Sequence, residues 1–181
     1  MHDSVLAFLR KNLTDEEVRG KRVAEIGSQD VNGSPRPIFM AFEPLEYIGM
    51  DSDKGKGVDL IVKADVLCEV LGSETFDIVI STEMLEHVVD WRLIIGQMKG
   101  LVKPGGLLIV TTRSPGFPYH PYPIDMWRYT LEDGKRIFAD MEILALENDP
   151  QAPGIFVKMR KPETFAPCDL STIELQPAPQ A

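Results

Sequence analysis

Short apolar runs recur along the chain and are separated by amphipathic or turn-rich segments. Seven of these runs fit strands: 22–26, 47–50, 60–63, 76–81, 107–111, 141–146 and 154–159. They are apolar on both faces, which is typical of strands in a parallel sheet that helices cover on both sides. Because such strands alternate with helical segments, the pattern predicts an α/β fold.

The clearest helix is predicted over residues 90–101. Its apolar residues recur at helical spacing and share one face: Trp91, Ile94, Ile95, Met98 and Leu101. The sequence KPGG at 103–106 is expected to end this helix, since proline and glycine do not continue it. Thr130 and Asp133 have the spacing of a capping box and predict the start of another helix. Helical spacing also occurs within residues 1–13.

One connection is too short for a regular crossover. Residues 52–57 (SDKGKG) are nearly all that separates the second and third predicted strands. A parallel crossover usually takes about a dozen residues or more. Either the third strand pairs at the edge of the sheet without an intervening helix, or the two strands form a hairpin.

Length and composition favour one domain. The chain has 181 residues, of which 44% are hydrophobic and 26% are charged, enough for one substantial core. From residue 162 onward the sequence is rich in proline and has little periodic pattern. We therefore expect a domain over 1–161 and a proline-rich tail over 162–181 that is loose or packs irregularly.

Charge and cysteine content restrict the partners. The formal net charge of −9 disfavours nucleic acid and anionic membranes, because both repel an acidic surface. No stretch approaches the roughly 20 apolar residues of a membrane span. Cys68 and Cys168 are too few for a disulfide framework and too far apart for a CxxC site. We expect a cytoplasmic protein, and the sequence does not indicate an oligomeric state.

Residues 25–34 (EIGSQDVNGS) form a glycine-containing turn after the first predicted strand, where two phosphate-binding patterns fail. Besides Gly27, a dinucleotide fingerprint needs glycine at positions 29 and 32, where the chain has Gln29 and Asn32. A P-loop starting at Gly27 needs glycine at 32 and lysine at 33, where the chain has Asn32 and Gly33. The turn therefore predicts a ligand that lacks phosphates.

Three acidic residues stand at the ends of the first three predicted strands: Glu25, Asp51 and Asp65. The carboxyl ends of parallel strands meet at one edge of a sheet, where ligands bind. Asp51 is suited to accept both hydroxyls of a ribose, and Asp65 to accept from the amine of adenine while the Val66 N–H donates to the ring. Such an edge attracts a cationic ligand rich in donors and repels pyrophosphate. S-adenosylmethionine is a ligand of that kind.

With these residues, the chain resembles the class I S-adenosylmethionine-dependent methyltransferases, in the small branch with LEH after the fourth strand. The matching stretches are VAEIGSQDVNGS (23–34), YIGMD (47–51), KADV (63–66), FDIVISTEMLEHVVD (76–90) and LVKPGGLLIVTTRSPGFPYHPYPIDMWRYT (101–130). The resemblance implies a single-domain, Rossmann-like, doubly wound sheet of seven mostly parallel strands, the last one antiparallel.

The resemblance also implies a set of residues that bind the cofactor S-adenosylmethionine: Glu25, Gly27, Ser28, Asp51, Ser52, Asp65, Val66, Ser81, Thr82 and Glu83. The resemblance implies that Glu25 and Gly27 border the methionine part of the cofactor, and that residues 81–83 form the loop beneath its transferred methyl group. The sequence departs from the family pattern at Gln29 and Val31, where small residues are usual.

A long aromatic segment is the expected acceptor wall. Residues 113–129 follow the fifth predicted strand and carry several prolines, which stiffen a binding loop. The expected substrate contacts are Phe117, Tyr119, His120, Tyr122, Trp127 and Arg128. The candidates for a catalytic base are His87, His120, Glu83 and Asp125, with histidine favoured because its pKa lies near neutrality. Trp127 and Arg128 have an alternative role as anchors of the loop.

The acceptor is expected to be a small molecule or a saccharide, with O-methylation preferred to N-methylation. A dehydrogenase is disfavoured because none of the four tyrosines has a lysine four residues later. Ser81 and Thr82 stand where metal-dependent enzymes usually have further carboxylates or amides, so no metal is expected. The remaining alternative is a scaffolding protein of the same fold that binds the cofactor without catalysis.

Overall fold

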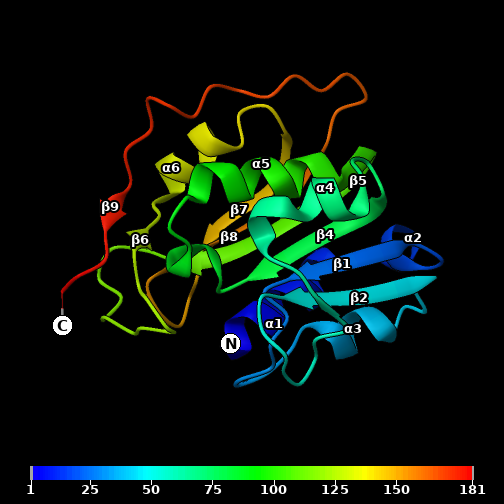
Figure 1. Cartoon of the computed structure of the whole chain (residues 1–181), viewed down its shortest axis with the longest axis horizontal. Helices are drawn as coiled ribbons and strands as arrows, with labels where there is room; N and C mark the ends of the chain where they lie inside the picture. Colours follow the sequence, from blue (N-terminus) through cyan, green and yellow to red (C-terminus); the bar gives the residue numbers. More distant parts are fainter. Residues whose placement is uncertain (1, 181) are drawn as a thin grey trace.

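The computed structural model describes residues 2–180, in which helices cover both faces of a central sheet (Figure 1). The order of the seven strands is β3-β2-β1-β4-β5-β8-β7. Their bounds are β1 Arg22–Ile26, β2 Glu46–Asp51, β3 Leu60–Ile61, β4 Phe76–Thr82, β5 Val102–Arg113, β7 Glu142–Asn148 and β8 Gly154–Arg160. A separate ribbon pairs β6 (Trp127–Arg128) with β9 (Gln176–Pro177).

The sheet confirms the predicted α/β, doubly wound class. Strand β8 runs antiparallel to both of its neighbours, β5 and β7, and the other pairings are parallel. Strand β5 begins already at Val102 instead of residue 107, because the amide of Gly105 donates to the Lys161 carbonyl and the Lys161 amide donates to Gly106. These bonds extend the strand through the segment that was expected to be only a helix stop.

Strand β3 pairs in parallel with β2 at the sheet edge, with Asp51 opposite Ile61. Of the two alternatives for this connection, edge pairing without a helix is confirmed and the hairpin is wrong. The short link turns back because the Asp59 carboxylate accepts from the Gly49 amide at 2.7 Å and pairs with Arg36.

The helices form two layers (Figure 1). One face is covered by α4 (Leu67–Leu71), α5 (Trp91–Leu101) and α6 (Leu131–Ile137), with the short turns η1 (Ala64–Val66) and η2 (Leu85–His87). The other face carries α1 (Asp3–Asn12) and α3 (Arg36–Met40), while α2 (Asp15–Val18) follows α1. Adjacent strand residues enter opposite cores: Val23 packs with α1 and α3, and Ala24 packs with α5.

Both predicted helix starts are confirmed. The Asp90 carboxylate caps α5 by accepting from the Leu93 amide at 3.1 Å. Thr130 and Asp133 form both bonds of the capping box at α6.

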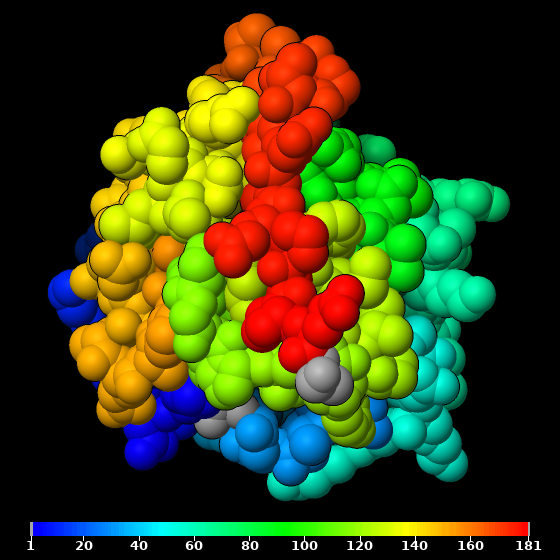
Figure 2. Space-filling model, turned by 90° about the vertical axis from the view of Figure 1, so that its left-hand side faces the viewer, coloured from blue at the N-terminus to red at the C-terminus, as the bar shows by residue number. Residues whose placement is uncertain are grey.

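The C-terminal segment is packed. The Arg92 guanidinium donates to the carbonyls of Leu170 and Ile173, and the buried side chains of Ile173 and Leu175 belong to the same hydrophobic cluster as the buried residues of α5. Figure 2 shows this segment, in red, running over the surface between α6 (yellow) and α5 (green). Within residues 2–180, no helix is both long and apolar enough to cross a bilayer.

Candidate functional site

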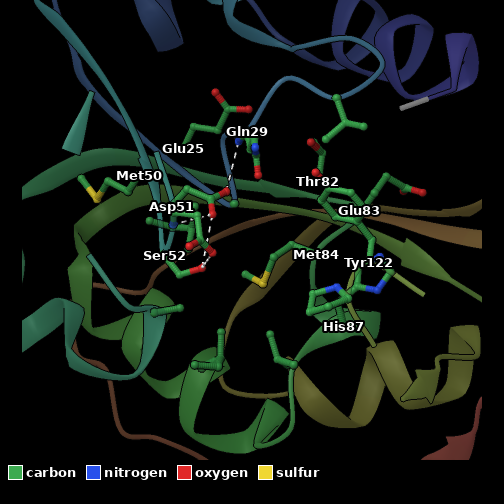
Figure 3. A pocket seen from close by; sticks show the side chains of 18 of the residues that line it. Glu25, Gln29, Met50, Asp51, Ser52, Thr82, Glu83, Met84, His87 and Tyr122 are labelled. Atoms are coloured by element: carbon green, nitrogen blue, oxygen red, sulfur yellow. Dashed lines mark hydrogen bonds between the residues drawn. The ribbon is translucent and has the colours of Figure 1, made fainter. Parts of the chain in front are cut away.

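A cavity of about 850 Å³ opens at the carboxyl ends of the parallel strands. Figure 3 shows Asp51 and Ser52 on one side of it and His87 and Tyr122 on the other. Its charged lining residues are the acids Glu25, Asp51, Asp53, Asp65, Glu83 and Asp90 and the bases Lys63 and Arg113. Since carboxylates outnumber cations in the wall, the cavity favours a cationic ligand over a polyphosphate.

Asp51 is held in position at the end of β2. Its carboxylate accepts from the backbone amides of Gln29 at 3.1 Å and Asp53 at 3.3 Å. Ser52 lies beside it, with its hydroxyl 2.9 Å from the Asp53 carboxylate. The backbone at Gln29, an unusual residue for this loop, therefore orients the carboxylate that was expected to contact a ribose.

Gly27 occupies a position that only glycine fills without strain. Its φ of +78° is in the left-handed region, and a Cβ there would lie 2.6 Å from the Met84 Cγ. The amide of Gly27 donates to the Met50 carbonyl at 2.9 Å, which closes the turn after β1. Because Met84 lies in the cavity wall, a side chain at position 27 would disturb that wall.

Glu25 is a nearly inaccessible carboxyl group in the cavity wall, 2% exposed. Its Oε2 accepts from the Tyr47 hydroxyl at 2.8 Å. Burial raises the pKa of Glu25 to about 7, although the hydrogen bond from Tyr47 acts in the opposite direction. Its charge is therefore poised near neutral pH, where a cationic ligand would favour the ionised form.

The predicted cofactor residues divide into two groups. The cavity wall includes Glu25, Gly27, Asp51, Ser52, Asp65, Thr82 and Glu83. Ser28, Val66 and Ser81 are not among the residues that line it, and their contact with the cofactor stays a prediction. The hydroxyls of Ser28 and Ser81 are buried behind the wall. The Val66 amide donates to the Lys63 carbonyl at 3.3 Å, so it is not free for the expected adenine contact.

Glu83 is engaged by residues of β5 and is not available as a base. Its backbone has a φ of +56°, and its carboxylate accepts from the Thr111 hydroxyl at 2.8 Å and pairs with Arg113. Arg113 also pairs with Asp149 at 3.2 Å and lies over the Phe117 ring. The role of Arg113 was missed, because nothing in the local sequence indicates that it links the loop after β4, the turn after β7 and the acceptor loop.

The aromatic loop supplies three of the six expected acceptor contacts. Phe117, His120 and Tyr122 line the cavity, whereas Tyr119, Trp127 and Arg128 do not. The indole of Trp127 donates to the Val88 carbonyl at 2.9 Å, and Arg128 is fully buried. These positions favour the alternative role of Trp127 and Arg128 as loop anchors over a contact with the acceptor.

Asp125 orients His120 and is itself fixed. Its carboxylate pairs with Arg128 at 2.6 Å and accepts from the backbone amide of His120 at 3.0 Å, with the His120 Nδ1 at 3.1 Å. Burial opposes ionisation of Asp125, but the bonds from Arg128 and the His120 amide outweigh it and lower the pKa to about 2. Asp125 therefore stays ionised at neutral pH and holds the His120 ring in place.

His87 and His120 are the two base candidates that face the cavity. The Nδ1 of His87 lies 2.5 Å from the Ile124 carbonyl, and the two imidazole rings pack edge to face at 4.9 Å. A carbonyl oxygen only accepts, so the His87 Nδ1 carries a proton, and in the neutral form of the ring the Nε2 holds the lone pair. The same reasoning applies to His120 opposite the ionised Asp125.

Comparison with known proteins gives matches in sequence. A family model described as a methyltransferase domain matches residues 7–146. A ubiquinone biosynthesis O-methyltransferase of Rhizobium etli is 36% identical over 116 residues, which cover 58% of this chain and 46% of the relative. The chain thus spans about half the length of the curated relatives of this kind.

Solved structures share the fold. An S-adenosylmethionine-dependent methyltransferase of Mesorhizobium loti superposes with a TM-score of 0.66 at 17% identity, over 87% of this chain and 98% of that one. The 1,6-didemethyltoxoflavin-N1-methyltransferase of Burkholderia thailandensis, with its acceptor and S-adenosylhomocysteine bound, also reaches 0.66, at 12% identity over 87% and 76% of the two chains. At these identities the similarity concerns the architecture alone.

Proposed function

Because the chain belongs to the methyltransferase-domain family, we propose that it transfers a methyl group from S-adenosylmethionine to a phenolic hydroxyl of a small molecule. The class of the protein, an S-adenosylmethionine-dependent methyltransferase, follows from that membership. The acceptor, the reacting atom and the roles of individual residues are the proposal.

On the cofactor side, Asp51 holds the ribose, Glu25 and Gly27 border the methionine part, and Asp65 lies toward adenine. The support is the cavity wall, in which these residues stand together with an excess of carboxylates. The sulfonium and the ammonium of the cofactor supply the positive charge that such a wall favours.

A single observation carries the proposal: the cavity that contains Asp51 also contains His120, whose ring is oriented by an ionised carboxylate. The sulfonium is an activated leaving group, so the protein must align the acceptor, remove its proton and exclude water. The hydroxyl proton passes to the His120 Nε2 as the acceptor oxygen attacks the methyl carbon. The C–S bond breaks and the C–O bond forms, which yields a methyl ether and S-adenosylhomocysteine.

A phenol is favoured over a saccharide for reasons of acidity and shape. A phenolic hydroxyl has a pKa of about 10, only a few units above that of a histidine at about 6.5, whereas an unactivated hydroxyl such as that of water has a pKa of about 15.7. The rings of Phe117 and Tyr122 also line the acceptor side, where they suit a planar molecule. The curated relatives carry an O-methyltransferase name, which agrees with transfer to oxygen.

Calorimetric titration with S-adenosylmethionine tests the cofactor side. Asp51→Ala is expected to weaken binding by about tenfold to a hundredfold, the value of charge-assisted hydrogen bonds to the ribose. Asp169→Ala, at an exposed position of the C-terminal segment, is the control and should bind as wild type. Absence of binding by the wild-type protein would contradict the cofactor assignment.

The acceptor side is tested by incubation with panels of phenols and of sugars, with S-adenosylhomocysteine measured by mass spectrometry. His120→Ala is expected to lower kcat on the best phenol by about 10² to 10⁴ without changing affinity for the cofactor. Turnover of sugars only would overturn the phenol assignment. Cofactor binding with no turnover in either panel would favour the scaffolding alternative.

A further inference from the structure

Glu86 is a buried carboxylate with one unsatisfied oxygen. The residue is fully inaccessible, and its Oε2 accepts from the Thr112 hydroxyl at 2.9 Å. Its Oε1 has no hydrogen-bond partner among the described residues. A buried carboxylate oxygen without a hydrogen-bond partner costs free energy of folding. A bound cation or a proton at this oxygen would remove that cost.

Two imidazole nitrogens face that oxygen. The Nε2 of His87 lies 3.9 Å from the Glu86 Oε1, and the Nε2 of His120 lies 3.8 Å from it. All three atoms lie within 4.8 Å of one another. Because both rings donate from Nδ1, Nε2 is the nitrogen that each ring can offer to a shared metal ion, which displaces any proton there on binding.

We propose that Glu86, His87 and His120 bind a divalent first-row transition-metal ion of the Zn²⁺ class. Three protein ligands leave at least one coordination position open, as in catalytic zinc sites. Two imidazoles and one carboxylate favour Zn²⁺ or Co²⁺ over Mg²⁺ and Ca²⁺, which prefer oxygen ligands throughout. The expectation of no metal considered only oxygen ligands directly after the fourth strand, and these three residues were not considered together.

The three ligand atoms have to move closer together to hold such an ion. Tetrahedral coordination with bonds of about 2.0–2.1 Å puts the ligand atoms about 3.3 Å apart. The two separations from Glu86, 3.9 and 3.8 Å, therefore have to shorten by about half an ångström, and the separation of the two Nε2 atoms, at most 4.8 Å, by up to about 1.5 Å. His120 belongs to the acceptor loop, and its side chain is 34% exposed, so it has room to move.

Each ligand already has the supporting hydrogen bond that metal sites require. His120 donates to Asp125, His87 donates to the Ile124 carbonyl, and Thr112 donates to Glu86. Such partners fix the ring tautomer and the direction of the lone pair. His87 and His120 line the cavity, so the open position of the ion faces the acceptor side.

This site does not depend on the proposed methyl transfer. In the metal-free protein the His120 Nε2 accepts the acceptor proton, whereas a bound ion occupies that lone pair and lowers the pKa of a coordinated hydroxyl instead. Metal binding is measured without cofactor or acceptor, so failure of either proposal is visible separately.

The test uses untagged full-length protein, stripped with a chelator and titrated with Zn²⁺ by calorimetry and with Co²⁺ by visible absorption. One ion per chain is expected, and His87→Ala and His120→Ala should each weaken binding at least about tenfold. His2→Ala is the matched control. His2 is the remaining histidine of the sequence and lines the same cavity, but its replacement should not change the affinity for Zn²⁺.

Glu86→Gln provides a variant that keeps the shape of the side chain and the bond from Thr112, and it should also weaken binding at least about tenfold. Circular dichroism verifies that each variant is folded, and His120→Ala, at a partly exposed loop position, decides the question should a buried variant fail to fold. Absence of binding by the wild type, wild-type affinity in His120→Ala, or Mg²⁺ binding as tight as Zn²⁺ would overturn the proposal.

Discussion

Replacement of Glu25 by glutamine is expected to raise the free energy of unfolding above neutral pH and to change it little in mild acid. Glu25 is 2% exposed and accepts a hydrogen bond from Tyr47 at 2.8 Å, which the amide oxygen of glutamine also accepts. The substitution therefore removes a buried charge while it retains the shape and the hydrogen bond.

The magnitude follows from the difference between the folded and unfolded states. Burial raises the pKa of Glu25 from 4.5 to about 7. Below pH 4.5 both states are protonated and there is no penalty. As the pH rises from 4.5 through about 7 the unfolded state ionises first, so the folded state loses stability, by about 3 kcal/mol in total at about 1.4 kcal/mol per pH unit. Glutamine does not ionise and escapes this loss.

Urea unfolding between about pH 5 and pH 8 measures the effect. The stability advantage of Glu25→Gln over wild type should grow across this range and level off above pH 7. Glu16→Gln, at an exposed position of α2, is the control and should stay within about 0.5 kcal/mol of wild type throughout. An advantage that does not change with pH, or a variant less stable than wild type at pH 8, would refute the reasoning.

The same carboxyl group links cofactor binding to protons. At pH 7 about half of the Glu25 population is protonated, and a cationic ligand in the cavity favours the ionised form. Binding of S-adenosylmethionine should therefore release about half a proton, measured as a dependence of the calorimetric enthalpy on the ionisation enthalpy of the buffer. In Glu25→Gln this dependence should disappear and the affinity should fall.

Two further substitutions and one truncation test other parts of the structure by urea or thermal unfolding. Gly27→Ala should cost about 2–4 kcal/mol through a positive φ and a clash, whereas Gly20→Ala, with the same sign of φ and open space, should cost only about 1 kcal/mol. Arg128→Ala should cost about 3–5 kcal/mol because it leaves Asp125 buried and unpaired, and the double variant Arg128→Met with Asp125→Leu should recover most of that loss. Deletion of residues 169–181 should cost about 3–6 kcal/mol, since the two buried apolar side chains of Ile173 and Leu175 are removed from the core, and an unchanged melting temperature would show that the segment only rests on the surface.

Much of the fold could be read from local patterns. The seven apolar runs became the seven strands of the sheet, and the cap at Asp90 and the capping box at Thr130 are where their residue types place them. These features depend on neighbouring residues along the chain, so a sequence pattern suffices to find them. The start of β5 and the direction of β3 were less accessible to a sequence pattern, because they depend on pairing with distant segments.

The candidate site was predictable only in part. Acids at strand ends have a position that follows from topology, and Glu25, Asp51 and Asp65 do line one cavity. Whether each carboxylate is ion-paired or accessible was not predictable, since this depends on partners far away in sequence. The carboxylate of Glu83 forms an ion pair with Arg113, and the carboxylate of Asp125 forms an ion pair with Arg128.

The sequence by itself therefore determined the class of fold, the order of its elements and the edge at which acidic side chains gather. Only the tertiary structure decided which of these side chains stay free, and it brought Glu86 of η2 together with the histidines at 87 and 120. The physical reason is range: periodicity and capping act within a few residues, whereas burial, ion pairing and ligand geometry arise when the sheet and the acceptor loop close on each other.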